Sequence, residues 1–272
     1  MAPGEPPKVD FGLDFEYEGM EAHYLRPMPP VSRARGRASL RPQFFELWVD
    51  DGVIADPANN LSVDVAALHG LIDHLDEKVE HVADILLAID TDVPQLLTLL
   101  DYKPLGYATS FGVSPQSING QMRGKVRFRI PLIKKLAMRD VTYQAALVAE
   151  QFLLSKGLEK LEPQPGDLEL TLDPSGIVAH GKFVILGSPT DVEWTESFTD
   201  KSGTPTRYTV RGPLGPDAAR TLGMPDVFEM GGTVDATTVL IGKGSRVGRG
   251  TVQADLRNAS FAFPIMEWKK PV

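Results

Sequence analysis

Apolar and polar side chains alternate along much of the chain, most clearly in its second half. Leucines at every second position from 168 to 172 are separated by polar residues. This period of two predicts a β-strand with one apolar and one polar face. Residues 173–176, Asp-Pro-Ser-Gly, predict a turn, because aspartate bonds to the nearby backbone, proline fixes φ and glycine suits the last position. A second strand through Phe183 and Ile185 follows, and a Ser-Pro turn ends it.

The same alternation, interrupted by short turns, predicts about a dozen strands in all. Because the connections are short, strands that are neighbours in the sequence should pair antiparallel. Repeated strand–helix units are missing from the pattern, which excludes doubly wound and (β/α)₈ architectures. We therefore predict an all-β, mainly antiparallel fold with one continuous sheet. The other predicted strands cover residues 9–24, 33–49, 61–67, 79–90, 118–130, 141–153, 206–211, 233–241 and 247–256.

Two segments depart from the alternation and predict short helices. In residues 92–108, Asp92 suits an N-cap, Pro94 suits a first helical turn, and the leucines between 96 and 100 have helical spacing. In residues 216–222, the helix is expected to stop at Gly223.

Composition narrows the classes of function. The 272 residues include no cysteine, which excludes disulfides, thiol catalysis and cysteine-ligated metal sites. The net charge of −8 argues against nucleic acid as a partner. No apolar run reaches the length of about 18 residues that a transmembrane helix needs. Residues 1–8 contain three prolines and no apolar core, so they do not form a signal peptide.

Cations at every second position form the sharpest polar pattern. They occupy one side of the predicted strand at 118–130, opposite an apolar side, and a similar set of arginines lies at 33, 35 and 37. Such a row suits contact with lipid headgroups or an acidic partner. The simpler interpretation, which we favour, is a solvated outer face that prevents strand-to-strand aggregation. The candidate residues are Arg123, Lys125, Arg127 and Arg129.

Candidate sites for other chemistry are weak. His74 and His81 flank a turn near Asp73, but a third fixed metal ligand is not evident. The glycine-rich basic segment 242–250 lacks the spacing of phosphate-binding loops and favours a hairpin turn. Carboxylate pairs are expected by chance among 36 acidic residues, and no nucleophile elbow is present. The sequence therefore predicts no cofactor, no metal site and no enzymatic activity.

A series of weak motifs nevertheless follows a recognisable order along the chain. The motifs are Leu99-Leu100-Asp101-Tyr102-Lys103-Pro104-Leu105, Gly120-Gln121-Met122-Arg123-Gly124 before Ile130-Pro131-Leu132, Gly176, Gly181, Leu186-Gly187-Ser188-Pro189, Trp194, Leu222-Gly223, Gly231-Gly232, Ala254-Asp255-Leu256 and Trp268-Lys269-Lys270-Pro271. Their order resembles the AsmA-like superfamily of Gram-negative envelope proteins, specifically the YhdP-like branch and, more distantly, TamB-like proteins. The resemblance covers roughly residues 96–271, whereas residues 1–95 share only the general alternating pattern.

The resemblance implies an elongated, curved, half-open sheet, with residues 1–95 as an N-terminal strand array and residues 96–272 as an AsmA-like groove segment. Its apolar groove would carry phospholipid acyl chains between the inner and outer membranes. The chain would be a soluble periplasmic fragment of a longer parent protein with an inner-membrane anchor, and other envelope proteins are possible partners. The alternative is a structural β-sandwich module with a solid core. The candidate lining residues are Met122, Val126, Phe128, Ile130, Leu168, Leu170, Leu172, Phe183, Ile185, Val234, Ala236, Leu240, Val252, Ala254 and Leu256.

Overall fold

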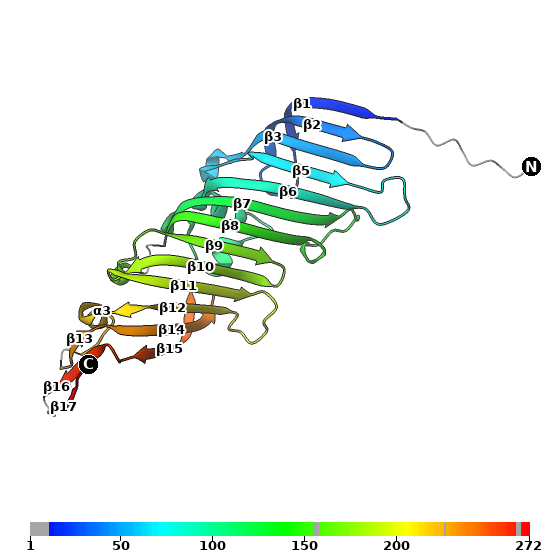
Figure 1. The fold of residues 1–272 in the computed structure, drawn as a ribbon. Coiled ribbons are helices and arrows are strands. Elements are labelled where there is room, and N and C mark those ends of the chain that lie inside the picture. The colour runs from blue at the N-terminus through cyan, green and yellow to red at the C-terminus, as the bar shows by residue number, and fades with distance from the viewer. Residues whose placement is uncertain (1–10, 155–157, 226, 265–267) are drawn as a thin grey trace, which may run out of the picture. The chain divides into compact units, whose positions relative to one another are not determined.

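The computed structural model describes residues 11–154, 158–225, 227–264 and 268–272. Most of them lie in β-strands, and the pairing is mostly antiparallel, which confirms the predicted fold class. Fourteen strands form one open sheet, from β1 (Leu13–Ala22) at one edge to β15 (Arg246–Asp255) at the other (Figure 1). Residues 1–8, on which the prediction about a signal peptide rests, lie outside the described residues.

The chain divides into two compact units. Unit 1 comprises Met1–Thr91, Tyr102–Pro104 and Arg123–Ala145, and unit 2 comprises the remaining residues. We predicted one boundary after residue 95, close to the end of the first segment of unit 1 at Thr91. The two later segments of unit 1, which follow residues of unit 2, were not predicted. As a result, β7 (Ile118–Pro131) and β8 (Thr142–Leu154) contribute residues to both units.

Unit 1 is a meander in which consecutive strands pair antiparallel in the order β1-β2-β3-β5-β6. The additional strand β4 pairs with the second half of β3 after a 3₁₀ turn at Pro57–Asn59. The Asp56 side chain caps that turn by accepting a hydrogen bond from the Ala58 N–H at 3.0 Å. The strands are β2 (Val31–Leu40), β3 (Phe45–Asp56), β4 (Leu61–Asp64), β5 (Ala67–Ile72) and β6 (Val82–Asp92).

Gly36 on β2 lies where a side chain of β1 reaches over it to the backbone of β3. The Tyr17 hydroxyl reaches from β1 across β2 and donates a 2.7 Å hydrogen bond to the Trp48 carbonyl of β3. A Cβ atom on Gly36 would lie 2.0 Å from that carbonyl oxygen and 2.7 Å from the Tyr17 hydroxyl. Only glycine therefore lets this hydrogen bond pass over β2.

We expect Gly36→Ala to lower the free energy of unfolding by about 1–3 kcal/mol, because backbone must move to accept the added methyl group. Chemical denaturation measures the change. Gly215→Ala is the control, because nothing lies within 4 Å of the added Cβ there. Equal stability of the two variants would contradict the claim that position 36 has no room for a Cβ atom.

Unit 2 continues as a second meander, β9-β10-β11-β12-β14-β15, again with antiparallel pairing throughout. The turn predicted at residues 173–176 is present, and the Ser175 N–H donates to the Asp173 carboxylate at 2.7 Å. The next turn is shifted from its predicted place. Leu186 and Gly187 form it, both with positive φ, and Ser188 already begins the next strand. The strands are β9 (Gly166–Asp173), β10 (Gly176–Ile185), β11 (Ser188–Ser197), β12 (Thr206–Leu214) and β14 (Val234–Lys243).

Both predicted helices are present in unit 2. The first predicted segment contains α1 (Val93–Leu100) and, after the break at Pro104–Gly106, a five-residue helix α2 (Tyr107–Phe111) that the sequence did not suggest. The second is α3 (Pro216–Thr221), and Gly223 follows its end with a φ of 102°. Among the described residues, no helix has the length and apolar character needed to cross a membrane.

A separate three-stranded sheet, β13-β16-β17, belongs to unit 2 and was not predicted. Its small core consists of Met230, Val234 and Ala259, against which Met224 and Phe261 pack. Its strands are β13 (Glu229–Gly232), β16 (Ala259–Phe263) and β17 (Trp268–Lys270).

Candidate functional site

The apolar face of unit 1 is one continuous surface across five strands. Residues directly opposite each other on neighbouring strands share a face, so the pairing register identifies its members. Three parallel rows cross the unit, and each row is apolar from end to end. The rows are Leu13, Leu40, Phe45, Ile72 and Ala83; Phe15, Ala38, Leu47, Gly70 and Ile85; and Tyr17, Gly36, Val49, Leu68 and Leu87.

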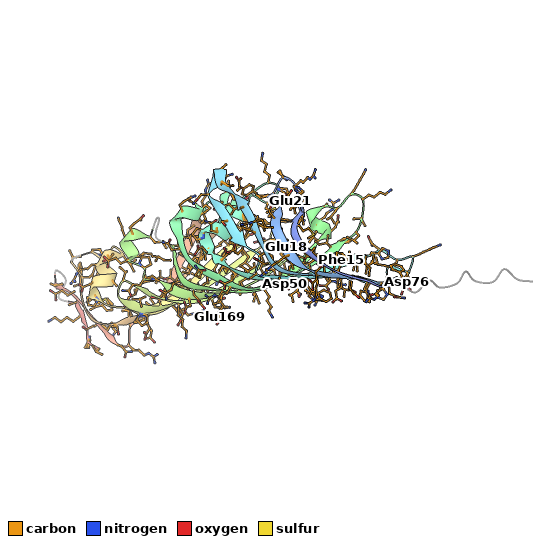
Figure 2. All side chains as sticks on the ribbon, turned by 90° about the horizontal axis from the view of Figure 1, so that it is seen from above. Phe15, Glu18, Glu21, Asp50, Asp76 and Glu169 are labelled. Atoms are coloured by element: carbon orange, nitrogen blue, oxygen red, sulfur yellow. The ribbon has the colours of Figure 1, made fainter. Side chains whose placement is uncertain are left out.

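Much of this face is open to solvent. Leu13 and Phe15 are 50% and 40% exposed, and side chains stand on both sides of the strands (Figure 2). Phe45, Leu47, Leu68, Ile85 and Leu87 are only half-buried. A closed core would bury such residues almost completely. Our prediction of lining residues named no residue of these five strands, although the alternation of Phe45, Leu47 and Val49 was visible in the sequence.

The two sides of β7 can be assigned from its contacts with β6. Arg127 binds Asp84, whose neighbours Ala83 and Ile85 belong to the apolar face. Arg127 and the other cations of β7 therefore point to the opposite, charged face, and the apolar candidates Val126, Phe128 and Ile130 share the apolar face of unit 1. All four cations of β7 are exposed, and Met122 and Val126 are buried.

Three of the four cations of β7 form ion pairs on the charged face of unit 1. The Arg127 guanidinium donates to the Asp84 carboxylate through Nε at 2.7 Å and through Nη2 at 2.5 Å. Arg129 approaches the same carboxylate at 3.9 Å, and Arg123 binds Asp90 at 3.3 Å. This arrangement favours the interpretation of the row as a solvated outer face over contact with headgroups.

The arginines of β2 lie in a similar environment. Arg35 pairs with Asp51 at 3.6 Å, and the Arg37 guanidinium lies 4.8 Å from the ring centre of Trp48. Trp48 stacks on His69, whose Nε2 lies 2.7 Å from the Glu46 carboxylate. Arg33 does not continue the alternation, because it has a φ of 53° beside an irregularity in the register.

The ion pair of Asp84 makes the stability of unit 1 depend slightly on pH. The hydrogen bonds from Arg127 lower the pKa of Asp84 below its usual value. A carboxylate with a lowered pKa in the folded state adds stability above its unfolded pKa of about 3.9, and this stability is lost as the pH falls through the folded value. Because the pair is exposed, we expect Asp84→Asn to cost no more than about 1 kcal/mol at pH 7.

The measurement is urea denaturation of the wild type and Asp84→Asn at pH 7 and at pH 3. The difference in free energy of unfolding between the two proteins should be smaller at pH 3 than at pH 7. A difference that grows on acidification would contradict the role assigned to the ion pair.

The apolar face of unit 2 follows the same geometry and includes the candidates on β9, β10, β14 and β15. Register pairing places all of them on one side of the sheet. Leu256 lies just beyond the end of β15. Two rows cross the six strands: Leu168, Gly181, Val192, Val210, Thr238 and Val252; and Leu170, Ala179, Trp194, Tyr208, Leu240 and Gly250.

The candidates on this face differ widely in exposure. Leu168, Val234 and Ala236 are buried, whereas Leu170, Leu172, Phe183, Ile185 and Leu240 are half-buried. At the edge strand, Ala254 is exposed and Val252 is 64% exposed. The first of the two rows contains only leucine, valine, glycine and threonine, so no aromatic side chain projects from it.

Helix α2 covers the second row at its aromatic residues. The Phe111 ring lies edge-on to Trp194 with 6.2 Å between ring centres, and Trp194 stacks on Tyr208. The Phe111 carbonyl accepts a 3.1 Å hydrogen bond from the Ser245 N–H in the turn between β14 and β15. The buried indole N–H of Trp194 has no hydrogen-bond partner among the described residues.

A buried polar pair lies on the same face, in line with Leu172 and Ile177 of β9 and β10. Glu196 and Thr206 are directly opposite each other on β11 and β12 and are 7% and 0% exposed. The Thr206 hydroxyl donates to the Glu196 carboxylate and accepts a 2.6 Å hydrogen bond from the Gly244 N–H. Burial, with a smaller effect of the Glu196 charge, raises the pKa of Tyr208 beside them. The pair is therefore a polar boundary of the apolar face.

The charged face of unit 2 carries a row of alternating sign. Asp167, Lys182, Asp191 and Arg211 are consecutive cross-strand neighbours on β9 to β12. Opposite charges in such positions attract each other weakly and suit a solvated surface. Arg211 also approaches Glu193 at 3.5 Å.

In the part of the chain that the structure describes, no group of three or more acidic or histidine side chains could hold a metal ion. The His74 ring pairs instead with Glu77 at 2.9 Å.

Comparison of the chain with protein-family models, curated proteins and solved structures found no match. The candidate functional surfaces are therefore the two apolar faces, and apolar ligands are what they can bind.

Proposed function

We propose that the chain is a segment of an AsmA-like protein of the YhdP-like kind, and that its apolar faces carry phospholipid acyl chains between the membranes of a Gram-negative envelope. One observation carries the proposal. In each unit, a continuous apolar face of the sheet stays partly exposed while the opposite face is charged. A contiguous exposed apolar surface rimmed by polar residues is typical of a ligand or partner site.

The energetics of the acyl chain support the same proposal. Each methylene group removed from water contributes about 0.8 kcal/mol, so a surface that offers continuous apolar contact binds a long chain without specific hydrogen bonds. The part of the first row from Val192 to Val252, which is not buried, offers such contact across four strands. The charged face keeps the same strands in contact with water.

The alternative, a closed β-sandwich serving as a structural module, requires a second layer over the apolar faces. Within the described ranges, the second sheet has three short strands and its own core around Met230. The half-buried rows of unit 1 therefore favour the lipid-binding proposal over the sandwich.

The experiment is to express the chain in the periplasm of a Gram-negative host, purify it without detergent and identify bound lipid by mass spectrometry. We expect phospholipid in roughly stoichiometric amount or above. Periplasmic location and an inner-membrane anchor on a longer parent protein are part of the proposal. Recovery of folded protein without phospholipid would overturn it.

A further inference from the structure

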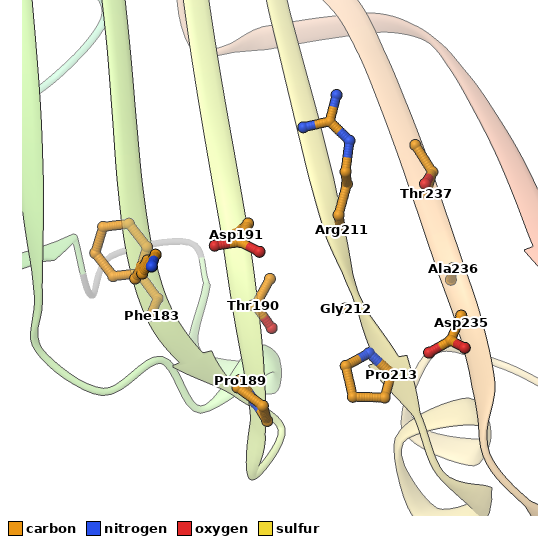
Figure 3. Close-up of a pocket in the computed structure, with 11 residues that line it drawn as sticks. Phe183, Pro189, Thr190, Asp191, Arg211, Gly212, Pro213, Asp235, Ala236 and Thr237 are labelled. Atoms are coloured by element: carbon orange, nitrogen blue, oxygen red, sulfur yellow. The ribbon is translucent and has the colours of Figure 1, made fainter.

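A pocket of about 460 Å³ lies where two strands of unit 2 part (Figure 3). The register of β11 with β12 ends at Asp191 and Arg211, whereas β11 stays paired with β10 up to Ser188 and β12 stays paired with β14 up to Leu214. Pro189 and Pro213 lie in the unpaired stretch. A proline has no N–H to donate to a neighbouring strand, so these two residues explain why the ladder stops.

The pocket is lined from both faces of the sheet. Phe183, Gly212 and Ala236 belong to the apolar face, whereas Lys182 and Arg211 belong to the charged face. A Cβ on Gly212 would lie 2.9 Å from the Pro189 carbonyl oxygen, so a larger residue would crowd this narrow place. A site with one apolar side and one charged side suits an amphipathic ligand.

The charges of the pocket include groups that other side chains do not neutralise. The side chains of Lys182 and Asp191 form no hydrogen bond or ion pair with any residue that the structure describes. The Asp235 carboxylate forms no hydrogen bond there either, but it lies close enough to Arg257 to contribute to the raised pKa of that guanidinium. Among the described residues, Arg211 forms one ion pair, the 3.5 Å contact with Glu193. The pocket thus presents two cations and two carboxylates side by side, which together carry no net charge.

We infer that this pocket binds a phosphoethanolamine group, with Lys182 and Arg211 facing the phosphate and with Asp191 and Asp235 facing the ammonium. Guanidinium and ammonium groups are good phosphate ligands, and a primary ammonium donates hydrogen bonds to carboxylates. As a lipid headgroup the ligand would place its acyl chains toward Phe183 on the apolar face. This inference rests on the proposed function for the lipid source, and the free zwitterion is the other source.

The test offers the purified chain mixed vesicles with equal amounts of phosphatidylethanolamine and phosphatidylglycerol that have identical acyl chains. After re-isolation, mass spectrometry gives the ratio of the two bound lipids. We expect phosphatidylethanolamine to be enriched about fivefold, because phosphatidylglycerol lacks the ammonium that the carboxylates bind. The double variant Asp191→Asn/Asp235→Asn should return the ratio to that of the vesicles, because the carboxylates that favour phosphatidylethanolamine are lost.

The matched control is Glu18→Gln/Glu169→Gln, which removes two exposed carboxylates that do not line the pocket. It should keep the wild-type ratio. A wild-type chain that binds both lipids equally, or an Asp191→Asn/Asp235→Asn variant that keeps the enrichment, would overturn the inference and leave the proposed function standing.

A second measurement separates the two sources. Calorimetric titration with soluble phosphoethanolamine tests the pocket without any lipid. Saturable binding that the Asp191→Asn/Asp235→Asn variant loses, together with no recovered lipid, would support the pocket for the free zwitterion and refute the lipid-carrying function. Failure to bind either phosphoethanolamine or its lipid would refute the pocket.

Discussion

Glutamate in place of Leu170 or Phe128 is expected to reduce the phospholipid recovered with the purified chain by about tenfold or more. Each variant places a carboxylate on an apolar face, Leu170 in unit 2 and Phe128 in unit 1, and acyl chains on that face would bury it. A loss of 1.4 kcal/mol in binding already corresponds to a tenfold weaker complex, and burying an unpaired carboxylate costs more than this.

The variants should still fold, because both positions are half-buried and the new side chain can reach water while no lipid is bound. Circular dichroism and thermal denaturation check this. The matched controls are Thr171→Glu and Lys125→Glu, which place the same side chain on the charged face of the same strands. Unchanged lipid recovery in folded Leu170→Glu would show that its row does not line the ligand path, and Phe128→Glu tests unit 1 in the same way.

The second large effect is expected at the buried polar pair. Thr206→Val should lower the free energy of unfolding by about 2–5 kcal/mol, because it leaves the Glu196 carboxylate and the Gly244 N–H buried without their partner. Valine keeps the shape of threonine, so the change reports the lost hydrogen bonds. The measurement is denaturation in urea at pH 7.

A double-mutant cycle sharpens this prediction. Glu196→Gln removes the charge, so Thr206→Val should cost less in the Glu196→Gln background than in the wild type. Thr209→Val is the control, since Thr209 is 5% exposed but its hydroxyl makes no hydrogen bond with a described residue. Equal costs for Thr206→Val and Thr209→Val would contradict the role of the pair.

Local alternation was enough to predict most strands of the main sheet, although the predicted strand at 33–49 joins the end of β2 to the start of β3. Leu168 on β9 and Val126 on β7 are buried, on the sides that the alternation marked as apolar. Side-chain direction in a strand depends only on parity, so no knowledge of the neighbours is needed. The turn at Asp173 was predicted for the same reason, since its chemistry lies within four residues. The turn at Leu186 was misplaced, because proline is tolerated at the start of a strand and Ser188-Pro189 therefore gave a false signal.

Features that depend on register could not be predicted. Glu196 has the same parity as Val192 and Trp194, which could have indicated a polar group on the apolar side. Its partner Thr206 lies across a hairpin whose length the sequence does not determine. Because the register is unknown from the sequence, the rows of unit 1, in which Phe45 lies opposite Ile72, could not be predicted. The pocket between Pro189 and Pro213 could not be predicted for the same reason. The five residues of α2 are too few for a helical pattern to be visible.

The order of the strands has a consequence for how the chain reaches its native state. In each unit, strands that are neighbours in the main sheet are also consecutive in the sequence, except that β3 pairs with β5 and β12 pairs with β14. Most of these partners are joined by short turns. Sheets made of such local pairings form faster than those that need distant segments to meet, because little loop entropy is lost before each new contact. Each hairpin can therefore add to the edge left by the one before it, so the sheet is able to grow from its first strand while later strands are still unfolded.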